Sequence, residues 1–138
     1  MRELPRKLTA EELGELFSGR TRLVERLARE EDPLGRGEEI VLAAPEEEQV
    51  EALAAHPRIG EPSTEQRGAE PEVLAELAEL NRAYEKRFGF RFVVFVNRRS
   101  RAELLPVLRE RLERTRAEEL ETGLRDLVAI ARHRWLNS

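Results

Sequence analysis

The strongest restriction on the fold of this sequence comes from its helix starts. In a capping box, a Ser or Thr side chain accepts a hydrogen bond from the peptide N–H three residues later. The Glu or Gln at that later position accepts a hydrogen bond from the peptide N–H of the Ser or Thr. Four pairs fit this pattern: Thr9 with Glu12, Ser63 with Gln66, Ser100 with Glu103, and Thr115 with Glu118. Pro45 and Pro71 also stand where a first helical residue would, each followed by acidic residues that suit the positive end of a helix. These signals divide most of the chain into helices.

Apolar residues between these starts recur at spacings of three and four, which is the period of an amphipathic helix. We therefore expect helices at about 10–17, 21–30, 37–43, 45–55, 71–88, 101–114 and 116–136. The fourth helix ends before Pro57, because a residue that precedes proline, here His56, avoids the helical conformation. The pattern predicts an all-α fold, a single-domain compact helical bundle of about seven to eight helices that covers residues 1–138.

One segment departs from this helical pattern. The stretch FRFVVFV at 90–96 is short and rich in β-branched and aromatic residues, as strands are. Nothing else in the sequence offers a partner strand, and a single strand cannot satisfy its own backbone hydrogen bonds. We therefore interpret this stretch as an extended or partly helical segment that is buried in the bundle.

The composition excludes several classes of function. The 138 residues carry a net charge of −4 with acidic and basic residues interleaved, so no basic stripe is available for nucleic acid. No apolar run approaches the ~20 residues that span a bilayer, and the first residues lack the apolar stretch of a secretory signal. The absence of cysteine removes disulfides and thiolate chemistry. We expect a soluble cytoplasmic protein without a nucleic-acid or membrane partner.

His56 is the first candidate for chemistry. It ends an amphipathic helix and is held extended by Pro57, which limits the directions that its ring can take. Imidazole has an unperturbed pKa of about 6.5, so it is the usual side chain for proton transfer at neutral pH. The competing interpretation is a surface histidine at a helix C-terminus, where the helix dipole favours imidazolium. The local sequence is compatible with both.

Glu65 and Gln66 follow in the predicted first turn of the next helix. A carboxylate at that place can orient the imidazole of His56 and raise its basicity. Alternatively, Glu65 complements the helix dipole while Gln66 closes the capping box with Ser63. This second interpretation also explains both residues.

Arg134 lies near the end of the last predicted helix, where the dipole favours cations. A guanidinium that faces a pocket is also a good clamp for a carboxylate or an imide oxygen. Arg132 carries the same charge, but Arg134 is three residues after Ala131 and seven after Leu127 and shares their core-facing side. We expect Arg132 to be turned away.

Metal and cofactor binding are not expected. His56 and His133 are far apart in the sequence, and neither has a second ligand at a spacing typical of zinc sites. The sequence also lacks the GxSxG, P-loop and GxGxxG patterns. The Leu-rich stripes are explained as core.

Several strings, taken in order, resemble a known family. AAHPRIGE, EQRGA, LAELNRAYEKRFGFRFVVFV, LRERL and IARHRWL occur in the order seen in OHCU decarboxylases, where OHCU is 2-oxo-4-hydroxy-4-carboxy-5-ureidoimidazoline. The upstream strings LFSGRTRLVERLA and DPLG are also similar to that family, so the resemblance spans about residues 8–136. The joint order of these strings is the specific part of the signal.

The resemblance implies an all-helical carboxy-lyase without a cofactor, usually a homodimer, that converts OHCU into (S)-allantoin in urate breakdown. It implies catalytic roles for His56, Glu65 and Arg134. It further implies substrate contacts by Pro57, Ser63, Gln66 and the backbone near Phe92 and Val93. The implied partner is the small ureidoimidazoline itself.

Two places depart from the family pattern. The loop between HPRIGE and EQ is short, and Pro62 stands where family members commonly have a serine three residues before the glutamate. Arg91 replaces a proline that often lies between the two phenylalanines. Two alternatives to the decarboxylase stay open, a helical interaction module without catalysis and a lyase or hydrolase that acts on another small cyclic ureide. Convergence of His56, Glu65 and Arg134 on one concavity would favour the enzyme.

Overall fold

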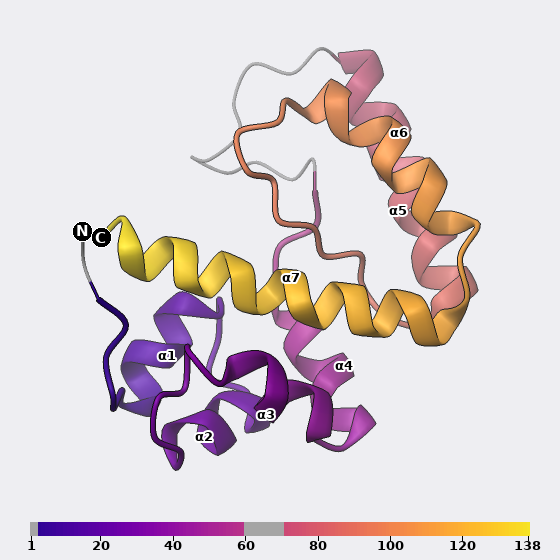
Figure 1. Ribbon diagram of the computed structural model, residues 1–138. Helices are drawn as coiled ribbons and strands as arrows, with labels where there is room; N and C mark the ends of the chain where they lie inside the picture. Colours follow the sequence, from indigo (N-terminus) through magenta and orange to yellow (C-terminus); the bar gives the residue numbers. More distant parts are fainter. Residues whose placement is uncertain (1–2, 60–70) are drawn as a thin grey trace.

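The computed structural model describes residues 3–59 and 71–138, and these ranges contain seven α-helices and no strand. The helices are α1 (Ala10–Leu16), α2 (Arg22–Ala28), α3 (Gly37–Ala43), α4 (Glu46–Ala55), α5 (Pro71–Phe88), α6 (Arg101–Leu112) and α7 (Arg116–Leu136) (Figure 1). The all-α prediction is confirmed for this part of the chain. Pro45 is the N-cap of α4 rather than its first residue, because its ψ of 143° is extended.

Three of the four predicted capping boxes are present. They pair Thr9 with Glu12, Ser100 with Glu103, and Thr115 with Glu118, with both hydrogen bonds formed in each. The fourth pair, Ser63 with Gln66, lies outside the described residues. Each such cap stabilises its helix by about 1 kcal/mol, so local chemistry fixes where α1, α6 and α7 begin.

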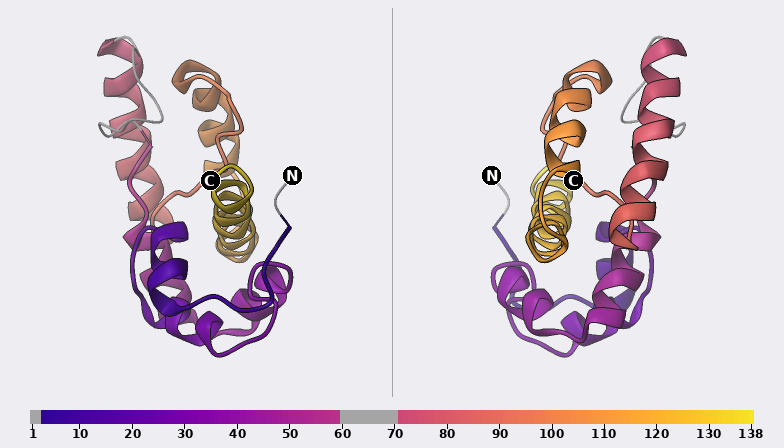
Figure 2. Two further views of the ribbon diagram at one scale, coloured as in Figure 1. Left: turned by 90° about the vertical axis from the view of Figure 1, so that its left-hand side faces the viewer. Right: turned by 90° about the vertical axis from the view of Figure 1, so that its right-hand side faces the viewer.

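The long helix α7 is the element against which the N-terminal helices pack. It contacts α1, α3 and α4, while α5 and α6 pack side by side as a pair that projects away from this group (Figures 1 and 2). None of the described helices combines the length and the apolar character that a membrane span needs.

The two ends of the described chain lie close together. The indole Nε1 of Trp135 donates a hydrogen bond to the carbonyl of Glu3 at 2.8 Å. Figure 1 accordingly shows the first described residues at the same corner as the C-terminal end of α7. Arg134 therefore lies at the corner where the chain enters and leaves the fold.

The 90–96 segment is extended and pairs with no strand among the described residues. Four of its side chains are buried: Phe90, Phe92, Val93 and Val94. Side chains from other elements bind its backbone, because Arg111 Nη1 donates to Val93 O and Asp126 Oδ2 accepts from the Phe95 N–H, both at 3.0 Å. The predicted burial is confirmed for these four side chains, and the segment is neither helix nor strand. Polar side chains take the place of the absent partner strand.

A buried ionic network joins this segment to three helices. Glu119 of α7, with no exposed surface, accepts hydrogen bonds from Tyr84 Oη at 2.6 Å and from Arg111 Nε at 2.7 Å. The guanidinium of Arg111 also lies over the ring of Phe92, 4.6 Å from its centroid. Burial and the neighbouring carboxylate raise the pKa of Tyr84, so its hydroxyl stays a donor. The 90–96 segment and the helices α5, α6 and α7 thus meet at one buried cluster of side chains.

Candidate functional site

His56 is the C-cap residue of α4. Its φ of −80° and ψ of 140° are the extended conformation expected before Pro57. The residue is only 9% exposed, so the alternative of a surface histidine at a helix end is wrong. The helix end and the proline together direct the ring into the protein.

The imidazole of His56 is held neutral. Its Nδ1 is buried and has no hydrogen-bond partner among the described residues. Burial lowers the pKa of His56 to about 4, with further lowering by the charges of Arg134 and Arg91. At neutral pH the imidazole is therefore uncharged and can accept a proton.

Arg134 reaches from α7 to the turn that follows α1. Its Nη1 donates to Leu16 O at 3.0 Å and to Ser18 Oγ at 2.8 Å. Ser18 has a φ of 65°, a left-handed conformation that costs a non-glycine residue roughly 1–2 kcal/mol. The hydrogen bond from Arg134 is one of the contacts that hold this unfavourable turn in place.

The same turn connects Arg134 with the end of α4. A Cβ atom placed on Gly19 would lie 3.3 Å from the Cβ of Ala55, the residue before His56. The influence of Arg134 on the pKa of His56 agrees with this placement. The structure therefore brings together two of the three residues to which the sequence assigned catalysis.

Arg132 differs from the expectation that it is turned away. Its Nε donates to Leu34 O at 2.6 Å and its Nη2 to Gly35 O at 3.1 Å, so it binds the turn before α3. The expectation failed because helical spacing describes only the side of α7 and not what packs against each side. Arg132 contacts that turn, and Arg134 contacts the turn beside His56.

Phe92 and Val93 have their side chains in the core, at 1% and 2% exposed. The carbonyl of Val93 already accepts a bond from Arg111. Among the described residues, no hydrogen bond uses the peptide N–H of either residue. Contact of this backbone with a ligand stays a prediction.

The remaining predicted site residues divide into two groups. Pro57 is exposed directly after His56. Ser63, Glu65 and Gln66 lie outside the described residues, so the predicted carboxylate partner of the imidazole is not placed.

The residues after Pro57 are tied to α5. Arg58 donates from Nε and Nη2 to the carboxylate of Glu85, at 2.7 and 3.0 Å. Asn81 Nδ2 donates to Ile59 O at 2.9 Å. These bonds fix the path of the chain as it leaves the histidine, which limits the mobility of His56 from its C-terminal side.

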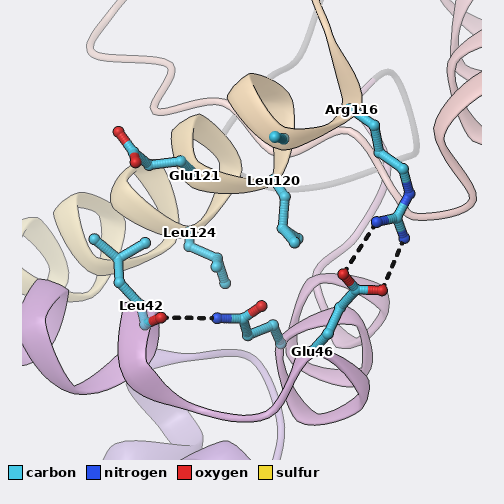
Figure 3. A pocket seen from close by; sticks show the side chains of 8 residues that line it. Leu42, Glu46, Arg116, Leu120, Glu121 and Leu124 are labelled. Atoms are coloured by element: carbon cyan, nitrogen blue, oxygen red, sulfur yellow. Dashed lines mark hydrogen bonds and ion pairs between the residues drawn. The ribbon is translucent and has the colours of Figure 1, made fainter.

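Two pockets lie away from the pair of His56 and Arg134. One of about 480 Å³ lies between α4 and the start of α7, where Glu46 and Arg116 form an ion pair at 3.1 Å (Figure 3). The other, of about 320 Å³, is lined partly by Arg58, Ile59 and Asn81. None of the predicted site residues that the structure describes lines either pocket. The second pocket is nevertheless next to the segment that leaves His56.

No group of three or more His, Cys, Asp or Glu side chains suited to a metal ion is found in the described part of the chain. The arrangement that is present offers one proton-accepting nitrogen and a nearby cation. Such a pair suits a ligand that carries negative charge and exchanges a proton.

Sequence reasoning missed the contacts of Ser18 and Arg91. Arg91 Nη1 donates to Ala54 O at 2.6 Å and to His56 O at 2.7 Å, so it binds the main chain of the histidine directly. The available signal was a charged residue inside an otherwise apolar segment, at a position where the family often has proline. For Ser18 the sequence holds no comparable signal.

A helical fold that sets a buried, neutral histidine beside an arginine defines a proton-transfer type of site. The sequence matches the family model of OHCU decarboxylase over residues 2–136, and the chain belongs to that family.

Individual relatives agree with this assignment. The chain is 35% identical over 98 residues to the uric acid degradation bifunctional protein TTL of Arabidopsis thaliana, a match that covers 59% of this chain and 30% of that protein. It is 28% identical over 100 residues to the 2-oxo-4-hydroxy-4-carboxy-5-ureidoimidazoline decarboxylase of Halalkalicoccus jeotgali, covering 64% of this chain and 57% of the relative. The matches thus span less than two thirds of the length of these relatives.

The fold also matches a solved structure. A crystal structure of OHCU decarboxylase in the presence of (S)-allantoin superposes with a TM-score of 0.79 at 26% identity. The superposition covers 91% of this chain and 96% of that one. The similarity therefore extends over the whole helical arrangement rather than over a single motif.

Proposed function

We propose that this protein is a carboxy-lyase that decarboxylates OHCU to (S)-allantoin. The observation that carries the proposal is the buried neutral His56, whose pKa the charge of Arg134 helps to lower, within a fold of the OHCU decarboxylase family. The combination supplies a proton carrier and a fixed positive charge for an anionic substrate.

The chemistry needs little more than orientation and one proton. The bond between the ring carbon and the carboxylate breaks and CO₂ leaves. The electron pair of the broken bond passes into the adjacent C=N, which serves as the electron sink. A site that holds the carboxylate out of the ring plane favours this step. The guanidinium of Arg134 is suited to hold a ring oxygen or the ureido group, because it is a planar fork of fixed charge.

The neutral state of His56 suggests how the product becomes a single enantiomer. After CO₂ leaves, the ring carries a hydroxyl on the carbon that becomes the carbonyl of allantoin. The neutral imidazole accepts the proton of that hydroxyl, and the resulting imidazolium returns a proton to one face of the neighbouring carbon. The ring nitrogen that received the electron pair takes up one proton from water. The histidine therefore ends neutral, and the turnover consumes the one proton that loss of CO₂ from a carboxylate requires. We assign to Glu65 the task of stabilising the transient imidazolium.

The proposal extends to the remaining expectations. The protein acts without a cofactor, on a small ureidoimidazoline, as a homodimer in the cytoplasm, and without nucleic-acid or membrane partners. The resemblance supports the homodimer, and the interleaved charges support the absence of nucleic acid. Sedimentation equilibrium tests the homodimer directly.

The proposed activity is tested by circular dichroism during urate oxidation by uricase and hydroxyisourate hydrolase. Without a decarboxylase, the chiral intermediate decays slowly to racemic allantoin. We expect this protein to speed the decay and to leave the signal of (S)-allantoin. An unchanged time course at high protein concentration refutes the proposal and favours an interaction module or another cyclic ureide as the ligand.

The matched variants for this assay are His56→Asn and His133→Asn. Only the first removes the buried imidazole, since His133 is exposed. We expect His56→Asn to lose turnover and keep the helical spectrum, while His133→Asn keeps both. Turnover that survives in His56→Asn removes His56 from the reaction.

A further inference from the structure

Arg91 binds the end of α4 in a way that no other described side chain does. Its Nη1 donates to two carbonyl groups, those of Ala54 at 2.6 Å and of His56 at 2.7 Å. Carbonyls at a helix C-terminus have no partner within the helix, and they carry the negative end of its dipole. A guanidinium at this place therefore satisfies both carbonyls and neutralises the helix end beside the histidine.

The rest of the guanidinium is also close to the site. Arg91 Nε is buried without a hydrogen-bond partner among the described residues, so no described carboxylate binds this nitrogen. The pKa of Glu85 on α5 is lowered mainly by its hydrogen bond with Arg58, and the charge of Arg91 adds a smaller lowering. Arg91 is thus a permanent cation that is bonded to the main chain of both Ala54 and His56.

Within the described ranges, few other charges face His56 from the elements around it. Arg134 approaches from α7, and the α1–α2 turn contributes the uncharged Ser18. Arg58, two residues after His56, is paired with Glu85. Burial is the main cause that disfavours protonation of the imidazole, and among the described residues the charges of Arg134 and Arg91 add to it.

We propose that Arg91 is a positioning residue for His56, which fixes the main chain at the end of α4 and places a permanent positive charge beside the imidazole before substrate binds. This inference rests on the proposed function, because it assigns to Arg91 the preparation of the residue that moves the proton. It also gives a physical role to the departure of Arg91 from the family pattern. A proline at this position has neither a positive charge nor a side-chain donor.

Three substitutions separate the two parts of this role. Arg91→Lys keeps the charge on a shorter side chain, Arg91→Gln keeps an amide donor without the charge, and Arg91→Met removes both. The readout is the titration of the His56 Cε1–H signal by proton NMR between about pH 3 and 8. The chain has two histidines, so the His133→Gln variant assigns the two signals.

We expect the midpoint of the His56 titration to rise by about one pH unit in Arg91→Gln and Arg91→Met, because a neighbouring like charge is removed. We expect it to stay unchanged in Arg91→Lys. In the allantoin assay, kcat should fall roughly tenfold or more in all three variants, least in Arg91→Lys, with KM changed less than about threefold. A role confined to stability would lower the melting temperature and leave the His56 midpoint where it is.

An unchanged His56 midpoint in folded Arg91→Gln overturns the proposal. If Arg91→Gln and Arg91→Met do not fold, Arg91→Lys decides, and full kcat in that variant overturns the positioning role. A parent protein without decarboxylase turnover refutes the proposed function instead, and the NMR titration then still decides whether the charge of Arg91 acts on the imidazole.

Discussion

Acid should destabilise this protein by an amount that the burial of His56 sets. The pKa of His56 is about 4 in the fold, against a value of 6.5 for a solvated imidazole. Between these values the unfolded chain binds more protons at this residue than the folded chain, so stability rises with pH across this window. The contribution is complete above about pH 6.5 and is lost as the pH falls toward 4. Its full size is about 3 kcal/mol, from 1.36 kcal/mol for each pKa unit.

The part of this window between pH 7 and pH 5 is convenient to measure. The two pKa values give a loss of about 1.8 kcal/mol from His56 alone over that interval. Urea unfolding followed by far-UV circular dichroism, at both pH values, gives the total loss for the parent and for His56→Asn. Since all other groups titrate in both proteins, the difference between the two losses isolates the histidine. His133→Asn, which keeps His56, should match the parent.

Equal losses in the parent and in His56→Asn would refute the reasoning. The imidazole would then be as solvated in the fold as in the unfolded chain, and its pKa in the fold would stay near 6.5 instead of about 4. A larger loss in the parent with the expected size supports the burial of the ring, whatever the substrate is.

Three further outcomes follow from the contacts described. Arg134→Lys should lower kcat/KM roughly 10- to 100-fold in the allantoin assay, because the bonds to Leu16 and Ser18 position the guanidinium; unchanged kcat/KM contradicts this. Glu119→Leu leaves the buried Arg111 without its main carboxylate, so calorimetry should show a melting temperature lower by about 10–17 °C, from 3–5 kcal/mol. Thr115→Ala should cost about 1 kcal/mol in urea unfolding, and a Ser replacement should restore most of it.

The helices could be predicted because their signals are local. Thr9, Ser100 and Thr115 each act on a peptide group three residues away, so the sequence that encodes the cap also contains its target. The extended conformation of His56 is equally local, since Pro57 imposes it on the residue before. Chemistry that operates within one turn of chain can be seen without the tertiary structure.

The site could be predicted only in part, because its contacts join distant segments. Arg134 was selected from helical spacing, yet its partner Ser18 is 116 positions away in the chain. Arg91 was noticed only as an unusual residue, since its acceptors on α4 are 35 and 37 positions away. Arg132 shows the same limit, because helical spacing gave it no partner and yet it binds a turn that is 97 or 98 positions away in the chain. Periodicity along a helix indicates on which side of that helix a residue lies, but it does not indicate which residue of another element it contacts.

The segment at 90–96 lies between these cases. Its sequence favours a strand, and the absence of a second strand argued against one. What could not be foreseen is that Arg111 and Asp126 would supply the hydrogen bonds that a neighbouring strand normally provides. Buried ionic groups of this kind are visible only once the helices that carry them are placed.

The hydrogen bond between Trp135 and Glu3 has a practical consequence for anyone who joins this fold to another polypeptide. Because both ends of the described chain meet at one corner, an attached domain or tag departs from the same place whichever end it uses. That corner is one residue from Arg134, so a bulky attachment lies close to the side chain that binds the turn after α1. A short linker that bridges the two ends, with new ends opened in an exposed turn far from this corner, would move such attachments away from the site.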